Sequence, residues 1–296
     1  MQIKKDSVQV QVPATSANLG PGFDCLGMAL DLRDMVWARA TAGRTHVEVN
    51  GAGQNTVPTD EDNLVVKAIR VGLTHVGAPQ VGLQLKCENS IPHGRGLGSS
   101  ATAIISGLMV ARAFIGEDDA LDLDTILQLA TQMEGHPDNV SPALYGGVTV
   151  SWQSDRARSI RLPLMQELTT TAFIPPKPVS TTKARALLPQ TVPHVDAAFN
   201  AGRAAVLVAT FLNGGENFFD ATADRLHQDY RTAAMPESVG LMHSLRHQGY
   251  PAVISGAGPT VLVLGKVKSV ICRQARERGW DVRQLKLQTE GARIIQ

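Results

Sequence analysis

Apolar and polar residues alternate in three short stretches near the start of the chain. This pattern predicts strands with one buried face over residues 8–12, 46–49 and 81–85. Three other stretches carry apolar residues at helical spacing, over residues 63–75, 100–114 and 123–134. The second of these is apolar on nearly every side, so we expect this helix to be central and buried.

The second half of the chain mixes the two patterns without strict alternation of strand and helix. Helical spacing occurs near residues 196–212, 236–249 and 267–278, and strand-like runs occur near residues 170–174, 252–255, 260–264 and 281–287. A polar and charged stretch over residues 151–163 separates the two halves, which predicts two domains, residues 1–158 and residues 159–296. The mixture of elements predicts an α+β fold.

Composition and charge exclude several classes of function. The 296 residues carry a formal net charge of +1, so no global field favours nucleic acid or an anionic membrane, and we expect neither as a partner. We expect no secretory signal and no membrane span. The three cysteines, Cys25, Cys87 and Cys272, show no metal-binding or disulfide spacing. Reduced thiols in a cytoplasmic protein are the expected state.

A glycine-rich loop precedes the predicted buried helix. Glycines 94, 96 and 98 alternate with other residues, and Ser99 and Ser100 follow. Such a loop can point free backbone N–H groups at one spot, where the helix dipole adds partial positive charge, and this arrangement binds phosphate. The loop matches neither GxxxxGK[ST] nor GxGxxG, because Ser99 stands where the third glycine of the latter should be. The alternative is a plain turn in which a serine caps the helix.

Two further segments concentrate small, turn-forming and polar residues. Residues 13–24 read PATSANLGPGFD, and residues 255–260 read SGAGPT between two apolar runs. Either segment alone is compatible with a tight connection. Together with the glycine loop PHGRGLGSSA, however, they resemble the three signature motifs of the GHMP kinases, and the resemblance extends over essentially the whole chain. It implies an N-terminal domain with a left-handed βαβ crossover, a C-terminal ferredoxin-like domain and an active site between them.

The resemblance also implies ATP and Mg²⁺ as cofactors. Mg²⁺ prefers hard oxygen ligands, and the family pattern places Ser100 and Glu134 in this role. Without the resemblance, Glu134 would be interpreted as a solvated charge at a helix end and Asn63 as a helix cap. The residues implied for ATP binding are Asn63, Pro92, His93, Gly94, Arg95, Gly96, Leu97, Gly98, Ser99, Ser100, Ala101 and Thr102.

Further segments resemble the homoserine-phosphorylating branch of this family. They are the sequence PATSANLGPGFDCLG, the run EGHPDN at residues 134–139, and STTKAR with LLP at residues 180–189. The branch implies L-homoserine as substrate and O-phospho-L-homoserine, a precursor of threonine, as product. The implied substrate-binding residues are Asn18, Asp24, His136, Asn139, Arg185 and Arg231.

Each implied substrate contact has a chemical reason. Arginine donors can bind both oxygens of a carboxylate, which suits Arg185 and Arg231. Asp24, helped by Asn18, would pair with the ammonium group. An isolated arginine would otherwise be interpreted as a surface cation.

The resemblance leaves the general base open. Several relatives use an aspartate near the transferred proton, whereas here the matching residue is Asn139, which cannot accept a proton at neutral pH. We therefore expect catalysis by Asn139, Glu134 and Ser100 through positioning and electrostatic stabilisation, with Asp138 as the rival base.

Two other functions remain open from the sequence alone. The first is a different GHMP kinase that acts on mevalonate, shikimate or a sugar. The two arginines favour a carboxylate and Asp24 favours an amine, and a sugar pocket would need neither. The second is a non-catalytic binding protein on the same fold, which would not need Ser100 and Glu134. The resemblance allows a homodimer, and threonine could inhibit by occupying the amino-acid pocket. Arg95, Lys177 and Lys183 receive no defined role from the residues alone.

Overall fold

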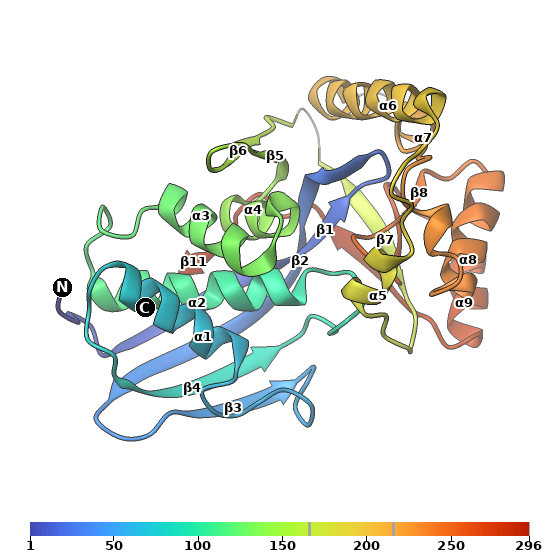
Figure 1. The fold of residues 1–296 in the computed structure, drawn as a ribbon. Helices are drawn as coiled ribbons and strands as arrows, with labels where there is room; N and C mark the ends of the chain where they lie inside the picture. Colours follow the sequence, from blue (N-terminus) through green and yellow to red (C-terminus); the bar gives the residue numbers. More distant parts are fainter. Residues whose placement is uncertain (165–166, 215–216, 296) are drawn as a thin grey trace.

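The computed structural model describes residues 1–164, 167–214 and 217–295. These residues form two β-sheets with helices packed against them (Figure 1). The predicted α+β class is therefore confirmed.

The first sheet has seven strands. Along its main path the strand order is β11-β1-β2-β4-β3, and β5 pairs with both β2 and β6. The strands are β1 (Ser7–Asn18), β2 (Gly22–Thr41), β3 (His46–Gly51), β4 (Gly82–Asn89), β5 (Val148–Gln153), β6 (Ala157–Arg161) and β11 (Arg293–Ile294). Neighbouring strands are antiparallel except β3 and β4, which run parallel and are joined through α1 (Leu64–His75). This connection is the βαβ unit that the resemblance implied.

Helix α2 (Ser99–Ile115) is the centre of the first half, as its apolar surface predicted. Nearly every residue from Ala101 onward is buried. Helices α1, α3 (Leu123–Glu134) and α4 (Pro137–Tyr145) pack around it. Gly107 allows α1 to approach closely, because a Cβ there would lie 2.4 Å from the carbonyl oxygen of Val65.

The second sheet has four antiparallel strands in the order β10-β7-β9-β8. They are β7 (Thr169–Ile174), β8 (Ala252–Ile254), β9 (Val261–Val263) and β10 (Asp281–Lys286), with α8 (Pro236–His247) before β8 and α9 (Ser269–Glu277) before β10. This βαββαβ connectivity confirms the predicted ferredoxin-like half. Between β7 and α8 the chain forms α5 (Thr181–Ala186), α6 (His194–Asn213), α7 (Phe218–Ala221) and the 3₁₀ helix η1 (Asp229–Arg231).

The polar stretch over residues 151–163 has a different structure from the predicted linker. It forms the end of β5, a turn and β6, which pairs with β5 inside the first sheet. The charged residues face solvent from this hairpin, which explains their composition. The predicted division between residues 158 and 159 thus falls within β6, and β11 returns to the first sheet near the end of the chain. The domain limits stay a prediction.

Helix α6 is the one described helix with the length and composition needed to cross a membrane. Only 22% of its most apolar window is buried. Helices that never enter a bilayer often share these properties, because an apolar helix also suits a protein core or an interface between subunits.

Candidate active site

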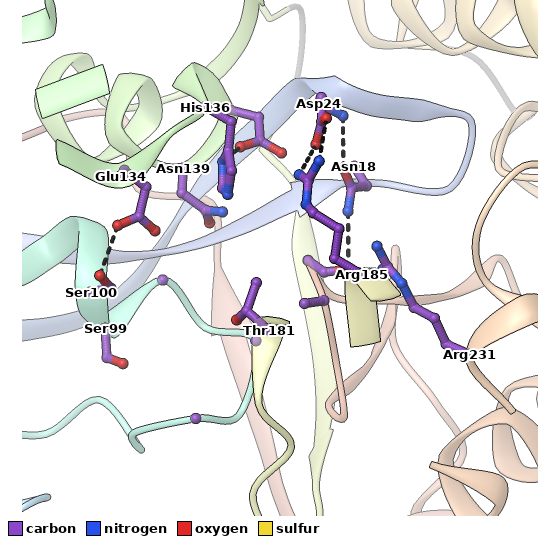
Figure 2. Close-up of a pocket in the computed structure, with 16 residues that line it drawn as sticks. Asn18, Asp24, Ser99, Ser100, Glu134, His136, Asn139, Thr181, Arg185 and Arg231 are labelled. Atoms are coloured by element: carbon purple, nitrogen blue, oxygen red, sulfur yellow. Dashed lines mark hydrogen bonds and ion pairs between the residues drawn. The ribbon is translucent and has the colours of Figure 1, made fainter. Parts of the chain in front are cut away.

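A cavity of about 80 Å³ brings together the segments singled out by the sequence (Figure 2). It lies where the two halves of the fold meet, since its walls come from both. Its lining residues are Asn18, Asp24, Gly94, Gly96, Gly98, Ser99, Ser100, Glu134, His136, Asp138, Asn139, Thr181, Arg185, Arg231, Gly256 and Ala257. All three motif segments therefore meet at one place, although the first and third are more than 200 residues apart in the chain.

The glycine loop is shaped by contact with the other two motifs. Gly96 and Gly98 have φ values of 74° and 72°, in the left-handed region that favours glycine. A Cβ at Gly98 would lie 1.9 Å from Thr15 Oγ1, and a Cβ at Gly96 would lie 2.2 Å from the carbonyl oxygen of Ser255. The loop thus packs between the first and third motifs with no room for side chains at these positions.

The first turn of α2 faces the cavity without a side-chain cap. The N-cap residue is Gly98, and no side chain caps the helix, so the alternative interpretation of a serine cap is wrong. Among the residues that the structure describes, none accepts a hydrogen bond from the first N–H groups of this turn, so they can bind an anion, and the helix dipole favours one there.

A second cavity of about 270 Å³ also adjoins this helix start, since Ser99 and Ser100 line both cavities. Asn63, His93 and Thr102 also line the second cavity. Asn63 caps α1, because its Oδ1 accepts from Val65 N at 2.9 Å and its Nδ2 donates to the carbonyl of Pro58 at 2.8 Å. It therefore shapes the wall through the helix cap, as its interpretation without the resemblance suggested.

The remaining residues of the predicted ATP set do not line either cavity. Leu97 and Ala101 are buried in the core. The Arg95 guanidinium donates to the carbonyls of His93 and Pro175 at 2.9 Å each, and also to that of Pro176. It binds the segment after β7, so any contact of Arg95, Leu97 or Ala101 with ATP would have to come from the backbone.

Ser100 and Glu134, the two residues that the resemblance implies for a metal, contact each other directly. Ser100 Oγ donates to Glu134 Oε2 at 2.7 Å. Burial raises the pKa of Glu134, and the Ser100 hydrogen bond and the charge of His136 oppose that rise. A hydroxyl and a carboxylate are hard oxygen donors, which suit Mg²⁺ when phosphate oxygens and waters supply the other ligands.

Asp24 and Arg185 face each other across the other end of the cavity (Figure 2). Arg185 Nη2 lies 2.6 Å from Asp24 Oδ1, and Nη1 lies 3.0 Å from Oδ2. Asn18 fixes this corner, because its Oδ1 accepts from Asp24 N at 3.0 Å and its Nδ2 donates to the carbonyl of Gly256 at 3.0 Å. Asn18 and Asp24 both have positive φ, 68° and 54°, a conformation that asparagine and aspartate tolerate better than most residues.

Arg231 is buried beside this pair. Its Nη1 donates to the carbonyl of Gly256 at 2.9 Å. Burial and the nearby charge of Arg185 lower the pKa of Arg231 to about 10. The two guanidinium groups lie on the ring of Phe23, 5.4 and 5.7 Å from its centroid. Two cations therefore converge on one small volume, which favours an anionic ligand group there.

His136 and Asn139 come from the turn into α4 and its first turn. His136 Nδ1 contacts Asp138 Oδ1. Burial opposes the charge of His136, but Asp138, Glu134 and Asp24 together raise its pKa. Asn139 Oδ1 accepts from Thr15 Oγ1 at 2.8 Å, which leaves its Nδ2 as the group available to a ligand.

Sequence reasoning missed several residues of this site. Thr181 lines the cavity at the start of α5, and its only signal was its place in the STTKAR segment. Thr15 and Phe23 lie in the first motif but received no role. Lys177 and Lys183 are exposed and line neither cavity.

Comparisons with known proteins agree with the geometry. Residues 63–147 match the model of the GHMP kinases N terminal domain. The homoserine kinase of Streptomyces avermitilis is 50% identical over 293 residues, which cover 98% of this chain and 96% of that protein. The homoserine kinase of Clavibacter michiganensis is 52% identical over 87% of this chain and 82% of its own length.

Solved structures give the same result. The crystal structure of homoserine kinase from Cytophaga hutchinsonii has a TM-score of 0.85 at 27% identity, covering 100% of this chain and 99% of that one. The mevalonate kinase of L. major shares the fold, with a TM-score of 0.69 at 14% identity over 98% of this chain and 99% of its own. The chain therefore belongs to the homoserine kinases, a branch of the ATP-dependent GHMP kinases.

Proposed function

We propose that the protein transfers the γ-phosphoryl group of ATP to the hydroxyl group of L-homoserine, which yields O-phospho-L-homoserine and ADP in threonine biosynthesis. The observation that carries this proposal is the composition of one cavity. The glycine loop, through Gly94, Gly96 and Gly98, lines this cavity together with Asp24, Arg185 and Arg231. A nucleotide and a zwitterion can thus lie side by side.

In this proposal the backbone N–H groups of residues 94–100 hold the triphosphate at the start of α2. The adenine base enters the larger cavity beside Asn63 and His93. Ser100 Oγ and the Glu134 carboxylate hold Mg²⁺, which neutralises charge on the phosphate oxygens when bound. The Ser100–Glu134 hydrogen bond supports this role, because it already places both oxygens at one point.

The amino acid would replace the contact between Asp24 and Arg185. Its ammonium group pairs with Asp24, and its carboxylate binds Arg185 and Arg231. His136 and the amide nitrogen of Asn139 lie on the same cavity wall as Glu134, which suits a role in orienting the reacting hydroxyl. Asn139 cannot take the proton, so positioning and electrostatic stabilisation carry the catalysis, and the proton passes to phosphate or water.

A substrate panel tests the proposal. Mg²⁺-dependent release of ADP would be measured with L-homoserine, mevalonate, shikimate, galactose and no acceptor. We expect release with L-homoserine only. Release with another alcohol would assign the chain a different substrate, and a folded protein that is silent with every acceptor would support a binding function.

We also propose a cytoplasmic homodimer of two-domain chains, with domains close to residues 1–158 and 159–296. The three free cysteines support a reducing compartment. Helix α6 is apolar and partly exposed, which supports a subunit interface on this helix. Its exposed apolar residues include Val195 and Val206. Light scattering of the protein and of Val206→Glu would test the dimer, since a charge in the interface should yield monomers.

A further inference from the structure

His227 lies directly behind Arg231 and takes no part in the site as described so far. Both residues are buried, with 1% and 2% of their surface exposed. Arg231 Nη1 lies 3.2 Å from His227 Nδ1, and His227 Nε2 lies 2.7 Å from the carbonyl oxygen of Gly20. The histidine thus connects the first motif with an arginine of the second half of the chain.

These two contacts define the protonation state of the ring. A carbonyl oxygen only accepts hydrogen bonds, so Nε2 must carry the proton. Nδ1 then carries a lone pair, which accepts a hydrogen bond from the guanidinium group of Arg231. A second proton would turn Nδ1 into a donor facing another donor. Burial lowers the pKa of His227, and the charge of Arg231 lowers it further, against the opposing effect of Asp224.

Hydrogen bonds fix the backbone around His227 as well as its ring. The carboxylate of Asp224 accepts from Leu226 N, His227 N and Gln228 N, at 3.0, 3.1 and 2.9 Å. The Phe23 ring packs on the imidazole, with centroids 5.1 Å apart. Few rotamers remain open to the histidine under these constraints, so its lone pair has a fixed direction.

His227 and the Gly256 carbonyl together occupy Arg231 Nη1. Among the residues that the structure describes, Nη2 of Arg231 has no hydrogen-bond partner, and Nε is buried without one. Arg231 lines the cavity, so Nη2 is the donor left for a ligand carboxylate, whereas Nε stays buried. An arginine without such support has many rotamers and loses more entropy on binding.

We propose that His227 is a positioning residue that orients Arg231 for the carboxylate of the amino-acid substrate. This inference rests on the proposed function, in which Arg231 binds that carboxylate. Neutral His227 accepts from one guanidinium nitrogen and leaves the other to the substrate.

Two substitutions separate positioning from simple stability. Asparagine at position 227 can place an amide oxygen near the position of Nδ1 and keep an acceptor for Arg231. Glutamine can reach the Gly20 carbonyl with its amide nitrogen but offers no acceptor at the Nδ1 position. We expect His227→Gln to raise the KM for L-homoserine roughly tenfold, as for loss of one hydrogen bond to a charged group, with the KM for ATP changed less than about twofold. His227→Asn should recover much of this loss.

A second readout reports directly on the carboxylate. The ratio of kcat/KM for L-homoserine to that for L-homoserine amide measures how strongly the enzyme uses the carboxylate charge. His227→Gln should reduce this ratio several-fold, because it weakens only the interaction that the amide lacks. A histidine needed only for folding would leave the ratio unchanged in the protein that remains folded, and that result would overturn the inference.

Gln228→Met is the matched control. Gln228 is the next residue, is equally buried, and accepts from Ile254 N at 2.6 Å, away from Arg231. It should lower the melting temperature and leave both KM values unchanged. Arg231→Lys tests the carboxylate role of Arg231 itself, which an unchanged KM for homoserine would refute. A raised KM in Arg231→Lys together with a normal KM in His227→Gln would refute only the positioning role.

Discussion

Arg185 and Asp24 bind each other through two hydrogen bonds in the cavity that we assign to the amino acid. Their side chains are 43% and 35% exposed, so the pair contributes little to stability and can open at small cost. A zwitterion offers each partner a replacement of the opposite charge. A ligand with only one charge would leave Asp24 or Arg185 unpaired, which disfavours its binding.

Asp24→Asn should therefore raise the KM for L-homoserine roughly 10- to 100-fold, because a hydrogen bond to a charged group is lost at the ammonium. Steady-state kinetics at saturating ATP measure this change. Asp229→Asn is the control, since Asp229 contacts the exposed His243 instead and should leave KM unchanged. A large fall in kcat at constant KM would contradict the assignment of Asp24.

Glu134→Gln should lower kcat by about 100-fold and raise the Mg²⁺ concentration needed for half-maximal activity. The carboxylate must be ionised to bind the metal, and burial raises its pKa. Activity should therefore be lost as the pH falls through this raised pKa, earlier on acidification than for an exposed glutamate. In the variant, the fall of kcat/KM at low pH that titration of Glu134 causes should be absent. Glu117→Gln, at an exposed carboxylate bound to Lys4, should behave as the parent does.

Asn139→Ala should reduce kcat by about 100-fold with little change in the fold, because it removes a donor near the reacting hydroxyl. Asn139→Asp should not exceed the parent rate if no side chain is needed as base. A large gain in the aspartate variant would show that proton transfer limits the reaction. Loss of turnover in a folded Asp138→Asn protein would instead move the role of base to Asp138.

The burial of Asp34 predicts how the stability of the fold depends on pH. It is buried and accepts from Ser90 N and Ile91 N, at 2.7 and 2.9 Å, just before the glycine loop. Burial raises its pKa from 3.8 to about 6. The folded state thus binds the proton more tightly than the unfolded state, and this group's contribution to stability falls as the pH rises from about 4 to 6.

The change amounts to at most about 3 kcal/mol in the free energy of unfolding. Asp34→Asn keeps an oxygen that can accept from both N–H groups, and it should remove this pH dependence. Urea unfolding at pH 4, 5, 6 and 7 measures the effect. Parallel pH profiles for the parent and the variant would contradict the prediction.

The sequence predicted most of the long elements and the meeting of the three motifs. The family assignment is confirmed by the relatives and by the solved structures. The 20-residue strand β2 escaped detection because its pairing with β1 shifts register twice, which breaks the alternation of buried and exposed positions. Short helices such as α4 and α5 carry too few turns to show a period.

The sequence predicted which residues lie near the site better than it predicted where their side chains point. Arg95 was placed among the ATP-binding residues because it lies in the glycine loop. Its direction is set by carbonyl groups about 80 residues away, which no local pattern reports. His227 was missed for the same reason, since its partners Gly20 and Arg231 meet only in the folded chain.

The bonds between the glycine loop and the segment after β7 bear on attempts to redesign the enzyme. Arg95 binds the carbonyls of Pro175 and Pro176, and Val179 N donates to the carbonyl of Gly94 at 3.0 Å. The same segment leads into α5, which carries Arg185. Grafting a foreign loop between β7 and α5 would therefore also disturb the glycine loop. A successful transplant of specificity would have to carry both pieces of backbone together.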